Sequence, residues 1–275
     1  MVSPMTRPDD RWIDLRRDAE TGIETLRAFF RGHAYDLHSH DEVLIGFTEQ
    51  GLQRFRCRRR VVSSTPGRVI LMEPGEPHDG ESPEPEGFTY GMIYMPADWL
   101  RTRAAREGGP AELGFRDTLA EDPALRRAVV AAFGALHGRE GRLARDETLD
   151  TLVDRLADVA HAPITAREPA VARARDVLHA AYRNDIGLAD LAAASGLDRF
   201  RLTRAFQAAL GASPHAYLVQ LRLRAARRLL AAGAAPAEAA ADAGFADQSH
   251  LGRWFRRGYG LTPAAYRRLC TNVPD

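Results

Sequence analysis

The chain has 275 residues, enough for two domains of ordinary size, and 45% of them are hydrophobic. Its net charge of +1 hides an asymmetry, because residues 1–169 carry 23 arginines against 29 acidic residues and residues 170–275 carry 15 against 8. A basic C-terminal half favours a polyanionic partner, and two distant cysteines, Cys57 and Cys270, argue against a disulfide framework. With no apolar run long enough for a membrane span and no signal-peptide core, we expect no membrane partner and a cytoplasmic location.

The N-terminal half is predicted to be rich in β-strands. After a polar stretch at residues 1–20 that we expect to be partly frayed, the runs VLIGF (43–47), RVILM (68–72) and FTYGMIYM (88–95) alternate with Gly/Pro turns. Several short strands separated by such turns are typical of an antiparallel barrel or sandwich.

Two amphipathic helices are predicted next, at about residues 122–137 and 146–160, because apolar side chains recur there at helical spacing. Their apolar stripes either pack on the barrel or pair with a second chain, and we expect a homodimer through this region. Pro163 and Pro169 then bracket a short linker, HAPITAREP.

From Ala170 onward the chain is predicted to be helical almost throughout, with breaks at glycines and prolines. The expected helices span about residues 170–183, 188–194, 198–210, 214–232, 236–243, 247–258 and 263–269.

Two stretches of this half, 188–217 and 236–266, repeat one pattern at an offset of about 49 residues. Each has a short Ala-rich helix, a Gly that allows a tight turn, an Asp that can cap the next helix, and an inner apolar pair four residues apart. The matching residues are Gly196 and Gly244, Asp198 and Asp247, Leu202 and Leu251, Phe206 and Phe255, Gly211 and Gly260, Pro214 and Pro263, and Tyr217 and Tyr266. The pattern predicts two helix-turn-helix units.

The outer face of each second helix is left free for a partner. It carries Arg201, Thr203 and Arg204 in the first unit, and Gln248, Ser249 and Arg253 in the second. Arginine and glutamine suit bidentate contacts with guanine and adenine edges. The alternative is an ordinary helical bundle with solvated arginines, which the duplication and the local charge excess disfavour.

Residues 170–270 resemble the DNA-binding domain of the AraC/XylS family of transcription regulators, most closely at the segment 239–268. The resemblance implies that helix 214–232 connects the two units and places their recognition helices in successive major grooves, about 34 Å apart. Carried over by position, the first helix would read bases with Phe200, Thr203 and Arg204. The second would read bases with Gln248, Ser249 and Arg253. The implied partner is double-stranded promoter DNA, and RNA polymerase is a further candidate.

The segment HSHDEVLIGFTEQG (38–51), together with PGRVILMEPGEPHDG (66–80), resembles the cupin sensor domain common in this family. The resemblance implies a barrel that binds a small-molecule effector, and two interpretations of its histidines stay open. His38, His40 and His78 either line an effector pocket or join Glu42 in binding a divalent metal, the one cofactor considered. Residues 38, 40 and 42 would share a strand face by alternation, and histidine with carboxylate suits Zn, Fe, Mn or Ni.

The arginine-rich run QRFRCRRRV (53–61) is predicted to be a strand with Phe55 and Cys57 on one face and arginines on the other. A solvated outer face is favoured over an anion-binding wall.

The predicted fold class is α+β: a cupin-like β-barrel, linker helices, and an all-α domain with two helix-turn-helix units. We assign residues 1–110 to effector sensing, 111–169 to a helical dimerisation and linker region, and 170–275 to DNA binding. The predicted function is a ligand-responsive, sequence-specific transcription regulator and not an enzyme. The alternatives are a metal-dependent cupin enzyme with a helical appendage and an architectural DNA-binding protein.

Overall fold

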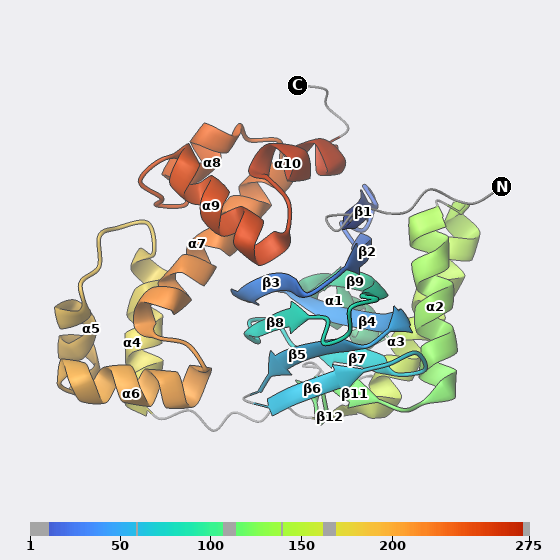
Figure 1. Ribbon diagram of the computed structural model, residues 1–275, viewed down its shortest axis with the longest axis horizontal. Coiled ribbons are helices and arrows are strands. Elements are labelled where there is room, and N and C mark those ends of the chain that lie inside the picture. The colour runs from blue at the N-terminus through green and yellow to red at the C-terminus, as the bar shows by residue number, and fades with distance from the viewer. Residues whose placement is uncertain (1–10, 59, 107–113, 139, 162–168, 272–275) are drawn as a thin grey trace. The chain divides into compact units, whose positions relative to one another are not determined.

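A computed structural model describes residues 11–58, 60–106, 114–138, 140–161 and 169–271 (Figure 1). The chain divides into two compact units. Unit 1 comprises Met1–Ala34, Asp41–Gly75 and Asp79–Pro163, and unit 2 comprises Tyr35–His40, Glu76–His78 and Ile164–Asp275. The predicted linker lies largely outside the described residues.

The larger β-sheet has six antiparallel strands. In spatial order they are β1 (Trp12–Arg17), β2 (Glu24–Phe30), β9 (Phe88–Pro96), β4 (Glu42–Gly51), β7 (Val69–Met72) and β11 (Leu119–Ala120). The run VLIGF of β4 is buried throughout, as an unbroken apolar run indicates for a strand covered on both faces.

Strand β1 corrects a prediction. Its residues were expected to fray, yet they pair with β2 from Trp12 opposite Phe29 to Arg17 opposite Glu24. Only Leu15 of β1 is buried, and the strand is held by backbone pairing and by polar contacts such as that of Arg17 with Glu24 at 2.9 Å, which side-chain polarity alone does not reveal.

The smaller sheet has four strands, in the order β3 (His33–His38), β8 (His78–Glu81), β5 (Gln53–Cys57) and β6 (Arg60–Ser64). Phe55 and Cys57 are buried in β5, as predicted. The single strand expected over residues 53–61 was wrong, because the chain reverses after Cys57 and Cys57 pairs with Arg60 of β6. The outward Arg54 and Arg56 pair with Glu81 at 2.8 Å and Asp79 at 2.6 Å. Carboxylates thus neutralise this face, which suits a solvated surface better than an anion-binding wall. A further two-stranded pair joins β10 (Gly114–Phe115) and β12 (Ala160–His161).

Among its described residues, unit 1 also has three helices: α1 (Ala97–Arg106), α2 (Pro123–Gly138) and α3 (Arg142–Val159). The sequence did not predict α1, whereas α2 and α3 lie close to their predicted positions. Their apolar stripes join the core of the six-stranded sheet, where the ring of Phe133 meets that of Phe47 edge-on, with centroids 5.3 Å apart. The stripes therefore pack on the sheet, and a dimer through these helices has to use their outer faces.

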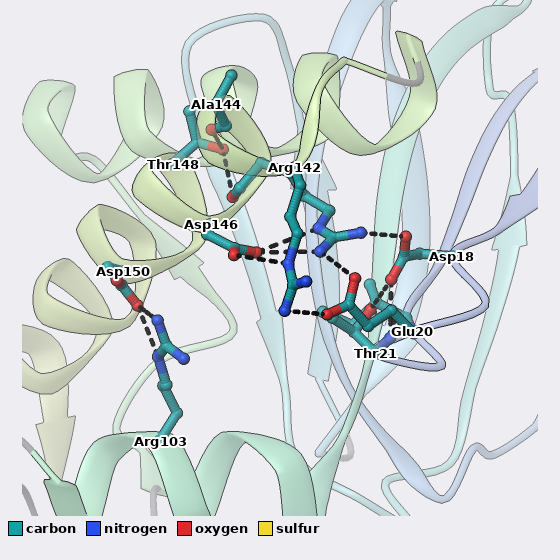
Figure 2. Close-up of polar contacts among 11 residues, drawn as sticks. Asp18, Glu20, Thr21, Arg103, Arg142, Ala144, Asp146, Thr148 and Asp150 are labelled. Carbon is teal, nitrogen blue, oxygen red and sulfur yellow. Dashed lines mark hydrogen bonds and ion pairs between the residues drawn. The ribbon is translucent and has the colours of Figure 1, made fainter.

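A charged network ties the start of α3 to the turn after β1. Arg145 is 9% exposed and pairs with Asp18 at 2.9 Å, Glu20 at 2.6 Å and Asp146 at 3.1 Å. Figure 2 shows Asp146 across from Asp18 and Glu20, with Arg142 reaching both Glu20 and Asp146. One guanidinium thus offsets the mutual repulsion of three acidic side chains.

The helices of unit 2 lie within two residues of their predicted ends. They are α4 (Pro169–Ala181), α5 (Leu188–Ser195), α6 (Arg199–Leu210), α7 (Pro214–Ala231), α8 (Pro236–Asp242), α9 (Gln248–Tyr259) and α10 (Pro263–Thr271). Leu202, Phe206 and Tyr217 belong to the core around α4–α7, and Phe255 packs on Tyr266 in the second half. Among the described residues, no helix is both long and apolar enough to cross a bilayer.

Candidate nucleic-acid interface and histidine cluster

The first helix pair, α5 and α6, is built as its sequence pattern predicts. Gly196 turns the chain with φ +73°, and the side chain of Asp198 accepts a hydrogen bond from the backbone N–H of Arg201 at 2.8 Å. Leu202 and Phe206 are fully buried. Since this apolar pair fixes the inner face of α6, the opposite face is presented outward.

The second pair, α8 and α9, repeats this construction under tighter constraint. Gly244 has φ +82°, and a Cβ placed there would lie 2.8 Å from both the Cα and the carbonyl oxygen of Arg183. Asp247 caps α9 by accepting from the backbone N–H of His250 at 2.6 Å. Leu251 and Phe255 are fully buried, as Leu202 and Phe206 are in the first pair.

The outward face of α6 contains the predicted first set of residues. Phe200 is 69% exposed, and Arg201 and Arg204 are also exposed. The guanidinium of Arg204 lies over the Phe200 ring, 5.5 Å from its centroid, so the two side chains form one surface element. Thr203 is half-buried, and its hydroxyl donates to the carbonyl of Arg199 at 2.9 Å.

The outward face of α9 presents Gln248, Ser249 and Arg253, all exposed. The sequence interpretation missed Trp254, whose Nε1 donates to Nε2 of His250 at 2.9 Å and whose ring lies under the guanidinium of Arg257, 5.3 Å from the centroid. It also missed the exposed Arg256. Arg256 follows Arg253 by three residues, so helical spacing already predicts a common face for the two.

The histidine cluster is the second candidate site, and it belongs to unit 2. His38, His40 and His78 are buried, and each offers a ring nitrogen such that the three nitrogens lie within 4.8 Å of one another. Glu42 is not part of this group: the chain leaves β3 at His38, and Glu42 begins β4 in the other sheet. The expected single strand through residues 38–42 was therefore wrong, although the three histidines do come together.

Backbone carbonyls orient two of these imidazoles. Nδ1 of His38 donates to the carbonyl of Asp36 at 2.7 Å, and Nδ1 of His78 donates to that of Glu76 at 3.0 Å. A carbonyl oxygen only accepts, so Nδ1 carries the proton and Nε2 carries the lone pair in the neutral ring. Burial lowers the pKa of His38 and of His40 well below the usual value, and nearby positive groups lower it further.

Helices α7 and α9 border the cluster within unit 2. The Tyr259 ring, at the end of α9, lies 5.4 Å from the rings of both His38 and His40. Arg227 of α7 places Nη1 3.5 Å from Nδ1 of His40, and its guanidinium lies 5.7 Å from the centroid of the Tyr259 ring. A cation, three imidazoles and a phenol are thus packed together.

Comparison with known proteins identifies two family domains. The AraC-like ligand-binding domain matches residues 20–153, and a helix-turn-helix domain matches residues 191–269. The HTH-type transcriptional regulator YbfI of Bacillus subtilis is 28% identical over 249 residues, covering 86% of this chain and 88% of YbfI. The transcriptional activator NphR of a Rhodococcus species is 27% identical over 292 residues, covering 94% and 84%. The chain belongs to the AraC family of transcription regulators.

A solved structure shares the fold over most of the chain. ToxT from Vibrio cholerae O395 superimposes with a TM-score of 0.58 at 14% identity, covering 91% of this chain and 99% of ToxT. It shares the mixed α/β N-terminal sheet domain and the helical C-terminal domain. The ligand-binding family match takes in α2 and most of α3, which agrees with the core that these helices share with the six-stranded sheet.

Proposed function

We propose that this AraC-family regulator reads a promoter sequence through two helix-turn-helix units, α5–α6 and α8–α9, and that an effector alters this binding. The observation that carries the proposal is the duplicated geometry of glycine turn, Asp cap and buried apolar pair. It presents Arg204 and Arg253 as exposed side chains at equivalent positions of the two repeats.

Roles differ among the outward residues. Arg204, Arg253 and Gln248 suit bidentate hydrogen bonds to base edges, because their forked donors and acceptors match guanine or adenine in the major groove. Phe200, stacked under Arg204, offers an apolar contact to a thymine methyl group. Arg201 and Ser249 suit phosphate or base contacts at the start of each helix, and Thr203 would serve mainly to shape the face.

We also propose a role for each part of the chain. Residues 1–110 sense the effector, 111–169 carry the helices of a homodimer interface, and 170–275 bind DNA in the cytoplasm, with RNA polymerase as a further partner. A small organic effector is compatible with the fold, since a structure of ToxT contains an unsaturated fatty acid. The outer faces of α2 and α3 would form the dimer contact, where Leu143 is 81% exposed.

The experiment is selection of bound duplexes from a random pool, followed by titration of the selected duplex. Arg204→Ala and Arg253→Ala should each weaken specific binding by roughly 1–3 kcal/mol, or about 5–150-fold, and change binding to random duplex less. Arg101→Ala is the matched control, because it removes the same charge from an exposed position on α1, outside the proposed dimer contact. Selection of no common sequence, or unchanged affinity in both test variants, would contradict the proposal.

A further inference from the structure

We propose that His38, His40 and His78 bind one transition-metal dication, such as Zn²⁺, Ni²⁺ or Co²⁺, and that its binding changes DNA affinity through Tyr259 and Arg227. This inference rests on the proposed function for its regulatory half only. The metal-binding half stands on the histidine geometry alone.

The donor set fits such an ion. Imidazole nitrogen suits zinc, copper, iron and nickel, and three histidines are a common protein set that leaves one coordination position for water or another ligand. In a tetrahedral site with bonds of about 2.0–2.1 Å, ligand nitrogens lie roughly 3.4 Å apart. The three nitrogens here lie within 4.8 Å of one another, so small side-chain rotations would bring them into range.

Two of the three imidazoles have the surroundings of metal ligands. Metal-binding histidines usually donate their second ring N–H to a carboxylate or a backbone carbonyl, which fixes the tautomer and the ring orientation. The rings of His38 and His78 make this bond, to the carbonyls of Asp36 and Glu76. Because both carbonyls lie two residues before their histidines, each short segment orients its own ligand.

The residues that border the histidine cluster would couple metal binding to DNA binding. A bound dication would repel the guanidinium of Arg227, whose Nη1 lies 3.5 Å from Nδ1 of His40. That guanidinium lies over the rings of Tyr259 in α9 and Tyr266 in α10, at 5.7 Å and 5.4 Å from their centroids. Moving it changes the packing at the end of the second recognition helix. Helix α9 also lies close to the cluster at Gly258, where a Cβ would lie 3.4 Å from Cβ of His38.

The first measurement uses the full chain with Zn²⁺, or with Co²⁺ for its absorption spectrum, and needs no DNA. Equilibrium dialysis should give one ion per chain, with a cobalt spectrum of nitrogen coordination. His38→Gln and His78→Gln should each weaken binding by at least about tenfold, the loss that removing an outer-shell partner already causes. His33→Ala is the matched control, because His33 is an exposed histidine on the same strand as His38. A folded wild-type chain that binds no ion, or one that binds equally well in all variants, overturns the proposal.

The second measurement adds the selected duplex. Zn²⁺ should change wild-type DNA affinity by about 5–150-fold, the usual range of coupling between sites. Tyr259→Leu should keep metal binding and lose most of this change. An ion that binds at the histidines without altering wild-type DNA affinity overturns the coupling, and an undiminished response in Tyr259→Leu overturns the route. Failure of the proposed function would instead appear as no sequence-specific DNA binding with or without metal.

Discussion

Gly244 closes the turn between α8 and α9, and its replacement by alanine tests how tightly that turn is built. A residue with a Cβ loses about 1–2 kcal/mol in the left-handed region, where φ of +82° places this position. The added Cβ would also lie 2.8 Å from backbone atoms of Arg183, which cannot rotate away. Overpacking of this kind costs typically 1–3 kcal/mol, so we expect the free energy of unfolding to fall by about 2–5 kcal/mol.

Two other glycines separate the conformational cost of a Cβ from the cost of its clash with Arg183. Gly196 has φ +73°, but its added Cβ would meet only the end of the Arg173 side chain, at 3.9 Å. Gly196→Ala should therefore cost only the conformational part, about 1–2 kcal/mol. Gly252 lies within α9 with nothing within 4 Å of an added Cβ, so Gly252→Ala should stabilise by up to about 1 kcal/mol.

The assay is thermal and urea unfolding of the full chain, followed by circular dichroism. At roughly 2–4 °C per kcal/mol, the Tm of the helical transition should fall most for Gly244→Ala, less for Gly196→Ala, and rise for Gly252→Ala. A loss of stability in Gly244→Ala no larger than that in Gly196→Ala would refute this prediction, since the clash with Arg183 would then be absent.

Four further results are expected. Arg145→Met should lower the free energy of unfolding by about 2–3 kcal/mol in urea titrations. This is less than breaking a fully buried ion pair costs, because two of the carboxylates that Arg145 contacts reach solvent. Arg142→Met, at a 75% exposed side chain, should lower the free energy of unfolding far less. Residues 166–275 should fold alone and bind DNA, and an unfolded fragment by circular dichroism would count against an independent domain. Sedimentation should show a dimer that Leu143→Asp disrupts. A wild-type chain that stays monomeric with and without DNA would exclude the homodimer. Burial lowers the pKa of His137, so its contribution to stability is present above about pH 6.5 and is lost as the pH falls below that value. His137→Gln should flatten this pH dependence in urea titrations, and an unchanged profile would exclude His137 as its source.

Helices α4–α10 could be predicted from sequence because local chemistry sets their ends. Glycines in the left-handed region and Asp caps mark the turns, and the structure confirms both at Gly196 and Asp198. Helix α1 gave little signal, since Leu100 and Ala104 are its fully buried residues and its other positions are mostly polar or exposed. Strand β1 was missed for a related reason: backbone pairing holds it, and polarity does not report pairing.

The two candidate sites also differ in how far the sequence could predict them. The outward faces of α6 and α9 follow from helical spacing, so most of their residues could be named in advance. The neighbours of the histidine cluster could not, because they depend on contacts such as that of Asp36 with Arg257, which are 221 residues apart in sequence. No periodicity encodes such a contact. The expected strand through Glu42 failed because the chain changes sheets between residues 38 and 42.

As recognition helices, α6 and α9 would read two neighbouring segments of one DNA sequence. Guanine-methylation interference on the selected duplex tests it most directly, because methyl groups at N7 block arginine contacts in the major groove. We expect two interference clusters about one helical turn apart, with Arg204→Ala relieving interference in one cluster and Arg253→Ala in the other. A single cluster, or interference that neither variant changes, would contradict it.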